Sequence, residues 1–172
     1  MIRGGEVILT AAEIAIGLAG FSGIVAAFSR MRPEDRVRFL MLVGGSFFVI
    51  VVAFVPFLLE LGGLAEPSVW RGSSGIWLLG FATALPMIRA GRKLIIAHGR
   101  PAPGWSIALL VLVMVTVALA QLGNTLAWPF QPGPVPFILA LMMGLVASGA
   151  IFVYMVLIRR DHLEPGAVSS EQ

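Results

Sequence analysis

The stretch of sequence that decides the fold class is residues 37–64, which read VRFLMLVGGSFFVIVVAFVPFLLELGGL. This stretch is longer than the roughly 20 mostly apolar residues that a helix needs to cross a bilayer. The extra length predicts that the helix tilts, bends or protrudes, and Pro56, which has no backbone donor, is where we expect a bend. Pro33, followed by two acidic residues, is typical of the start of this helix.

Four further apolar stretches accompany this one. The five predicted spans are approximately residues 7–29, 37–64, 73–89, 106–128 and 137–158. Residues 1–158 would then form a single transmembrane helical domain, and residues 159–172 a polar cytoplasmic tail. We expect a short loop with Glu66, Pro67 and Arg71 before the third span, and a proline-rich loop from Pro129 to Pro136 before the fifth.

The third span is slightly short of the hydrocarbon core. It carries Arg89, Arg92 and Lys93 at its inner end, on one face, where they can reach the headgroups and complete the crossing. The same three side chains are candidate contacts for anionic lipids, although setting the topology is a sufficient role for them. Only one glycine lies in the residues that follow this inner end, so we expect the helix to continue to about Ile96. We expect it to bend at Pro86, because proline has no backbone donor.

Composition supports the same fold class. Hydrophobic residues make up 58% of the 172-residue chain, and charged residues make up only 12%, about half the usual share. A soluble domain of this size could not hide so much apolar surface from water. The predicted fold class is therefore an all-α membrane protein, a bundle of five transmembrane helices in contact with the lipid bilayer.

The Lys and Arg residues predict an orientation. With the N-terminus outside, the segments on the cytoplasmic side carry ten of them and the outer segments carry only Arg3 and Arg71. This bias predicts a plasma membrane protein, a bacterial inner membrane protein, with its C-terminus in the cytoplasm. It also explains the basic charge without nucleic acid. A cleaved signal peptide is disfavoured, because Glu6 and Glu13 stand where such a peptide is basic or apolar.

Four polar residues within the predicted spans form the candidate polar or ion site: Glu13, Glu60, Gln121 and Asn124. The predicted boundaries place Glu13 about 9 Å and Glu60 about 6 Å inside the outer ends of neighbouring spans. Ionisable groups in spans usually face a bundle interior or a wet cavity, which favours a proton or cation site. The alternative is that Glu60 reaches the headgroups and that the two amides hydrogen-bond neighbouring helices.

Small residues follow two faces of the first span, one with Ala15, Ala19, Gly23 and Ala27 and the other with Glu13, Gly17 and Gly20. The fifth span carries Ala140, Gly144 and Ser148 at four-residue spacing. Such faces allow close helix contact, either in a dimer or within one bundle.

Residues 12–27, AEIAIGLAGFSGIVAA, resemble the first helix of small bacterial multi-pass membrane proteins of unassigned function. The resemblance covers this helix and implies no activity or site residue.

Metal, haem and soluble-enzyme chemistry have no support in the sequence. The chain has no cysteine, and its histidines, His98 and His162, both lie outside the predicted spans. No nucleotide-binding or hydrolase motif is present, so we expect no enzyme activity and no cofactor. The leading functional hypothesis is a small transport or permeation component that uses Glu13 and Glu60. The alternative is a non-catalytic membrane scaffold, assembled with itself or with a larger complex.

Overall fold

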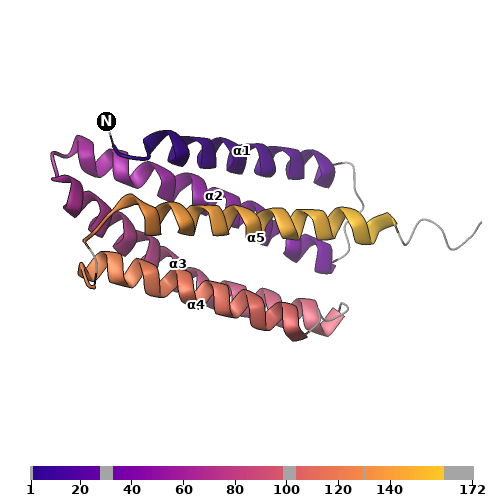
Figure 1. Ribbon diagram of the computed structural model, residues 1–172. Coiled ribbons are helices and arrows are strands. Elements are labelled where there is room, and N and C mark those ends of the chain that lie inside the picture. The colour runs from indigo at the N-terminus through magenta and orange to yellow at the C-terminus, as the bar shows by residue number, and fades with distance from the viewer. Residues whose placement is uncertain (1, 28–32, 99–103, 130, 161–172) are drawn as a thin grey trace, which may run out of the picture.

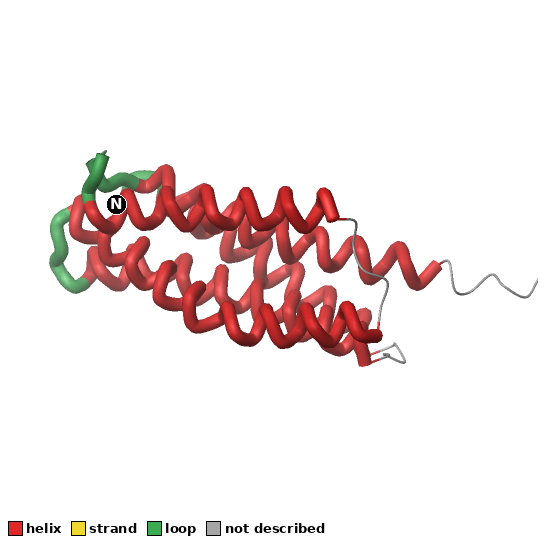
Figure 2. Tube along the Cα trace, turned by 90° about the horizontal axis from the view of Figure 1, so that it is seen from below, coloured by secondary structure: helices red, strands yellow, loops and turns green. Residues whose placement is uncertain are grey.

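The computed structural model describes residues 2–27, 33–98, 104–129 and 131–160. This part of the chain is helical, and its short connections gather at one end of the bundle (Figure 2). Its helices are α1 (Gly5–Ala27), α2 (Pro33–Leu61), α3 (Glu66–His98), α4 (Gly104–Leu126) and α5 (Pro134–Arg160). The predicted all-α fold of five helices is therefore confirmed.

The helices lie side by side, and successive helices run in opposite directions (Figure 1). The start of α1 and the end of α5 consequently lie at opposite ends of the bundle. Helix α2 is central, because it packs against α1, α3 and α5. Within the described residues α1 packs only against α2 and α5, so it is an edge helix with one side open.

Apolar side chains fill the interior and also cover the outside. The largest fully buried side chains are Trp70 and Phe137, whose ring centroids lie 6.1 Å apart. The core also includes Ile8, Ala11, Ala15, Val49, Val52, Trp77 and Leu141. Large apolar side chains are also exposed around the bundle, among them Phe47, Leu58, Leu79, Leu112, Leu119 and Val146. A bundle with an apolar outside as well as an apolar core fits a lipid environment.

Three helices are long and apolar enough to span a membrane, over Gly5–Val25, Arg36–Leu61 and Pro134–Val153. The prediction of five spans is thus supported for the first, second and fifth helices. In α4 the apolar stretch within the described side chains, Val111–Leu126, is too short for this criterion. In α3 only residues 72–88 separate Arg71 from Arg89, so its uncharged part is also short.

Helix α2 starts at Pro33, as predicted, but it ends at Leu61 and not at Leu64. Gly63 ends it by adopting a positive φ of 80°, a conformation that glycine accepts without strain. The amide of Leu64 then donates to the carbonyl of Leu59, which closes the helix end.

The predicted loop before the third span is wrong, because Glu66, Pro67 and Arg71 belong to α3. The carbonyl of Ala65 accepts hydrogen bonds from Ser68 and Val69, and Pro67 stands in the first turn, where its missing N–H is not needed. The continuation of α3 past Ile88 is confirmed, since the helix runs to His98. Pro56 and Pro86 both lie inside helices, and the bends expected there stay predictions.

The remaining helix ends differ from the predicted ones by a few residues. Helix α1 begins at Gly5 and α4 ends at Leu126, each two residues before the predicted boundary. Helix α5 begins at Pro134, inside the predicted proline-rich loop, and it includes Arg159 and Arg160. The predicted end of the first span and residues 161–172 of the tail lie outside the described residues.

Candidate functional site

Asn124 holds the connection between α4 and α5 in place. Its Oδ1 accepts a hydrogen bond from the amide of Gly133 at 2.9 Å, and its Nδ2 donates to the carbonyl of the same residue at 3.1 Å. The side chain thus pairs with the backbone of Gly133 as a neighbouring strand would. The Asn124 side chain is buried, and it provides a hydrogen-bond partner for both polar backbone groups of Gly133.

The two amides also join three helices. Asn124 Nδ2 donates to Ser74 Oγ on α3 at 2.7 Å, and Gln121 Nε2 donates to the carbonyl of Pro136, in the first turn of α5, at 2.5 Å. Gln121 is fully buried, and its Oε1 has no partner among the described residues. These bonds agree with the interpretation of Gln121 and Asn124 as links between neighbouring helices.

Arg71 adds a link that the sequence did not reveal. Its Nε donates to the carbonyl of Thr125, in the last turn of α4, at 3.1 Å. A cation near the C-terminus of a helix also interacts favourably with the helix dipole. The two residues are 54 positions apart, so no local pattern could indicate this contact. The role of Ser74 was missed for the same reason, since its partner Asn124 is 50 positions away.

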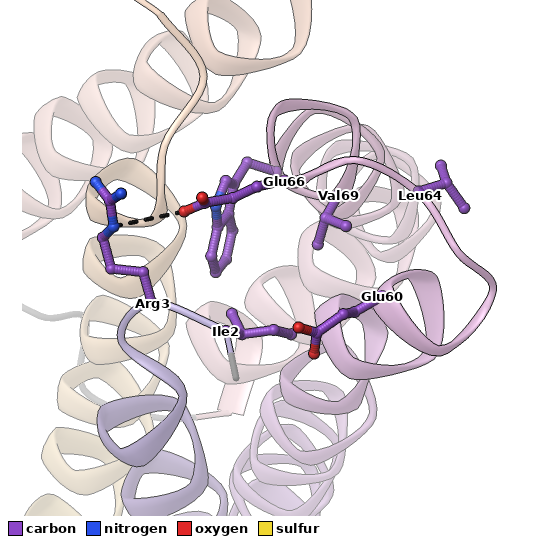
Figure 3. A pocket seen from close by; sticks show the side chains of 7 residues that line it. Ile2, Arg3, Glu60, Leu64, Glu66 and Val69 are labelled. Carbon is purple, nitrogen blue, oxygen red and sulfur yellow. Dashed lines mark ion pairs between the residues drawn. The ribbon is translucent and has the colours of Figure 1, made fainter.

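Glu60 lies at the end of the bundle and not within it. It is the last residue but one of α2, and its exposed side chain lines a pocket of about 370 Å³ together with Arg3, Glu66 and Trp70. Figure 3 places its carboxylate beside Ile2 and places the pair of Arg3 and Glu66 across the pocket. Arg3 Nε lies 3.5 Å from Glu66 Oε1, and both side chains are at least half exposed.

Glu13 lies elsewhere, on the open side of α1. Its side chain is exposed, as are Gly17 and Gly20, which follow it at helical spacing on the same face. A Cβ built on either glycine would meet no atom within 4 Å. We call Glu13, Gly17 and Gly20 the Glu13 face.

The structure does not bring Glu13 together with the other three candidate residues. Since α1 begins at Gly5 and α2 ends at Leu61, Glu13 is about 12 Å and Glu60 about 1.5 Å from those helix ends. The two carboxylates appeared to share a depth because the predicted outer ends of the two helices were two and three residues away from the observed ends. The observed ends place Glu13 deeper and Glu60 less deep than the sequence suggested. Gln121 and Asn124 bond to α3, to α5 and to Gly133, and neither bonds to a carboxylate among the described residues.

The small-residue face of α5 packs against other helices of the same bundle. Ala140 and Ser148 on α5 are buried, and a Cβ on Gly144 would lie 2.8 Å from Val49 Cγ2 on α2. Close packing within one bundle therefore accounts for the small residues of α5. The Glu13 face has no such neighbour in the described structure.

The candidate lipid contacts at the far end of α3 are partly described. Arg89 and Lys93 are exposed at four-residue spacing, and the side chain of Arg92 lies outside the described residues. Their binding to anionic lipids stays a prediction. As to metals, no group of three or more His, Asp or Glu side chains in the described part of the chain is placed to hold an ion.

Comparison with known proteins adds no relative. No family model matches the chain, and no curated protein or solved structure matches it. The resemblance of the first helix to small bacterial membrane proteins is therefore not supported by a family assignment, and function has to be argued from the residues.

Proposed function

We propose that this chain is an integral membrane protein that crosses the bilayer five times. Three of its helices have the length and composition of spans. Helices α3 and α4 lie alongside them, so a bilayer that encloses α1, α2 and α5 also encloses the other two (Figure 1). The charged ends of α3 then extend beyond the hydrocarbon core, which its 33-residue length allows.

The proposed orientation has the N-terminus outside and the C-terminus in the cytoplasm of a bacterial cell. It is supported by the cations, since Arg3 and Arg71 lie at one end of the bundle and Arg36, Arg38, Arg89 and Lys93 toward the other. A reporter that is active only in the cytoplasm should be active when fused after Gln172. Activity there of a reporter that folds only outside the membrane would overturn the orientation.

Within that membrane, we infer a non-catalytic role as a scaffold or as a subunit of a larger complex. The observation that carries this proposal is the outward position of Glu13, deep in α1 and beside two glycines whose Cβ positions are open. Intramembrane carboxylates rarely face lipid, and they normally pair with another group. A contact with a second protein supplies such a pairing, whereas a transport site would need Glu13 inside the bundle.

Photocrosslinking in native membranes tests the scaffold role. Ile24 extends the Glu13 face by one turn and is exposed, so a photoreactive phenylalanine derivative fits there. Leu79, exposed on α3, is the matched control. We expect a discrete heavier product from position 24 and only lipid adducts from position 79. Lipid adducts alone at both positions would contradict the scaffold proposal.

Transport is the second candidate function, because Glu60 and Glu66 both line the pocket at the end of the bundle. Its test is the flux of protons or sodium ions into vesicles that contain the purified protein. The scaffold proposal predicts that wild type gives the same flux as empty vesicles. Flux that is lost in Glu60→Gln or Glu13→Gln would replace the scaffold proposal with transport.

A further inference from the structure

Glu13 lies near the middle of a candidate span. The span Gly5–Val25 has 21 residues, and Glu13 is the ninth of them. At 1.5 Å per residue the carboxylate is anchored about 12 Å from the start of a crossing of about 30 Å. A short Glu side chain at this depth does not reach the headgroups as a long Arg or Lys side chain can.

The charge at this depth lacks compensation from the chain itself. Among the described residues, no hydrogen bond or ion pair involves the Glu13 side chain. An ionised group in the middle of a bilayer is unfavourable unless another group pairs with it. Since α1 packs only against α2 and α5 in the described structure, the group that pairs with Glu13 has to approach from the open side.

The glycines make room for that approach. Gly17 and Gly20 lie one and two turns further along the helix, and no atom lies within 4 Å of a Cβ built on either. Elsewhere in the bundle, a Cβ on Gly80 would lie 2.5 Å from the ring of Phe48, so that glycine already serves a close internal contact. The open glycines of α1 permit the same closeness to a helix from another chain.

Charge complementarity identifies the kind of helix. A second copy that pairs through the same face about a twofold axis would bring Glu13 against Glu13, which repel when ionised. The described cations lie toward helix ends and off the Glu13 face; they are Arg3, Arg36, Arg38, Arg71, Arg89 and Lys93. The described part of a second copy therefore offers no cation at the depth of Glu13.

We propose that the Glu13 face binds a transmembrane helix of a different membrane protein, one that carries a single Lys or Arg near the middle of its span. The ion pair forms in the bilayer interior, and the glycines let the two backbones come close enough to exclude lipid from it. This inference rests on the proposed scaffold function, and it specifies the chemistry of the partner.

The test uses the full-length protein in phosphatidylcholine vesicles and a defined probe. The probe is a tryptophan-flanked Leu/Ala transmembrane peptide with one central Lys, compared with the same peptide with a central Leu. Because the chain has no cysteine, Ala65→Cys in the exposed turn after α2 gives one site for a fluorescent donor. Energy transfer to an acceptor on the peptide measures binding as a function of the peptide-to-lipid ratio.

We expect wild type to bind the Lys peptide about tenfold more tightly than the Leu peptide, the scale of a polar contact between helices in a membrane. Glu13→Gln should remove this preference. Glu6→Gln, which changes an exposed carboxylate in the first turn of the same helix, should keep it. Glu13→Lys should reverse it, so that a peptide with a central Glu binds more tightly than the Lys peptide.

Two further variants test the shape of the face. Gly20→Leu should weaken binding of the Lys peptide, whereas Gly44→Leu, at an equally open glycine on α2, should not. Equal binding of the Lys and Leu peptides to wild type would overturn the inference, and so would an undiminished preference in Glu13→Gln.

The peptide-binding experiment and the crosslinking experiment can give different results, so failure of this inference can be distinguished from failure of the scaffold proposal. A crosslink at position 24 without a preference for the Lys peptide would retain the scaffold and reject a cationic partner. Absence of the crosslink would reject the scaffold itself. Self-association that is lost in Glu13→Gln would identify a second copy as the occupant and would also overturn the inference.

Discussion

Asn124 and Glu13 are both strongly polar residues inside predicted spans, and the folded chain treats them in opposite ways. Asn124 is buried at the junction of α3, α4 and α5 and bonds to both polar groups of Gly133. Glu13 is exposed on the open side of α1, beside unoccupied glycine positions. The difference follows from chemistry, since a neutral amide can be satisfied by backbone groups inside a bundle, whereas an ionised carboxylate needs a counter-charge.

The largest expected effect comes from removing the buried amide. Asn124→Leu should lower the free energy of unfolding by about 2–4 kcal/mol, because the amide and carbonyl of Gly133 lose their partners in a partly buried place and Asn124 also loses its bond to Ser74. Glu13→Gln, a change on the open face, should not lower it, because the described structure gives this carboxylate no partner to lose. Thermal unfolding in detergent micelles measures both. Equal effects of the two substitutions would remove the contrast between the two regions.

A pair of glycines sharpens the same contrast between filled and open faces. Gly80→Ala should destabilise the protein by about 1–3 kcal/mol, because its Cβ would lie 2.5 Å from Phe48 Cε2 and the ring would have to move. Gly20→Ala should be neutral or stabilising by up to about 1 kcal/mol, since it adds helix propensity where there is room. The same unfolding experiment compares them. A loss of stability in Gly20→Ala would mean that the face is already occupied.

A smaller effect is expected at the link between α3 and α4. Arg71→Met keeps most of the side-chain length and removes the hydrogen bond from Nε to the carbonyl of Thr125. The bond is exposed, so we expect a loss of about 0.5–1 kcal/mol in the free energy of unfolding. A loss as large as that of Asn124→Leu would show that the end of α4 depends on Arg71 as much as on the buried amide.

The smallest effect is expected at the rim of the pocket. Arg3 and Glu66 are 78% and 50% exposed, and the contact between Arg3 Nε and Glu66 Oε1 is 3.5 Å, so solvent screens the pair. Arg3→Gln should change the free energy of unfolding by less than about 0.5 kcal/mol. A larger change that disappears at high salt would indicate that this pair fastens the N-terminal segment to α3.

The sequence was sufficient to predict the helices because they depend on local composition. Long apolar runs, Pro33 at the start of α2 and the absence of proline between Ile88 and His98 all act within a few residues. The predicted loop before α3 is wrong because α3 begins at Glu66, and proline is well accommodated in the first turn of a helix, where Pro67 stands. A criterion based on apolar length and hydropathy supports three spans within the described residues, and α3 is not one of them.

The candidate site could be predicted only in part. That Glu13 and Glu60 are unusual was evident from their positions in apolar runs, but the inference of a shared depth needed boundaries accurate to one turn. The observed start of α1 makes Glu13 two residues deeper than predicted, and the observed end of α2 makes Glu60 three residues less deep. Together these differences change the relative depth of the carboxylates by several ångströms. The links from Asn124 to Ser74 and from Arg71 to Thr125 join distant positions, so they depend on how the helices pack together.

The most direct test of the central claim measures which face of α1 meets lipid in the isolated protein. Single cysteines introduced at positions 13, 15, 17, 20, 22 and 24 can each carry a nitroxide label in vesicles, and the accessibility of each label to oxygen reports contact with lipid. The account predicts high accessibility at positions 13, 17, 20 and 24 and low accessibility at 15 and 22, where Ala15 and Ser22 are buried. Low accessibility at positions 13, 17 and 20, with high accessibility at 15 and 22, would place Glu13 inside the bundle and contradict the account.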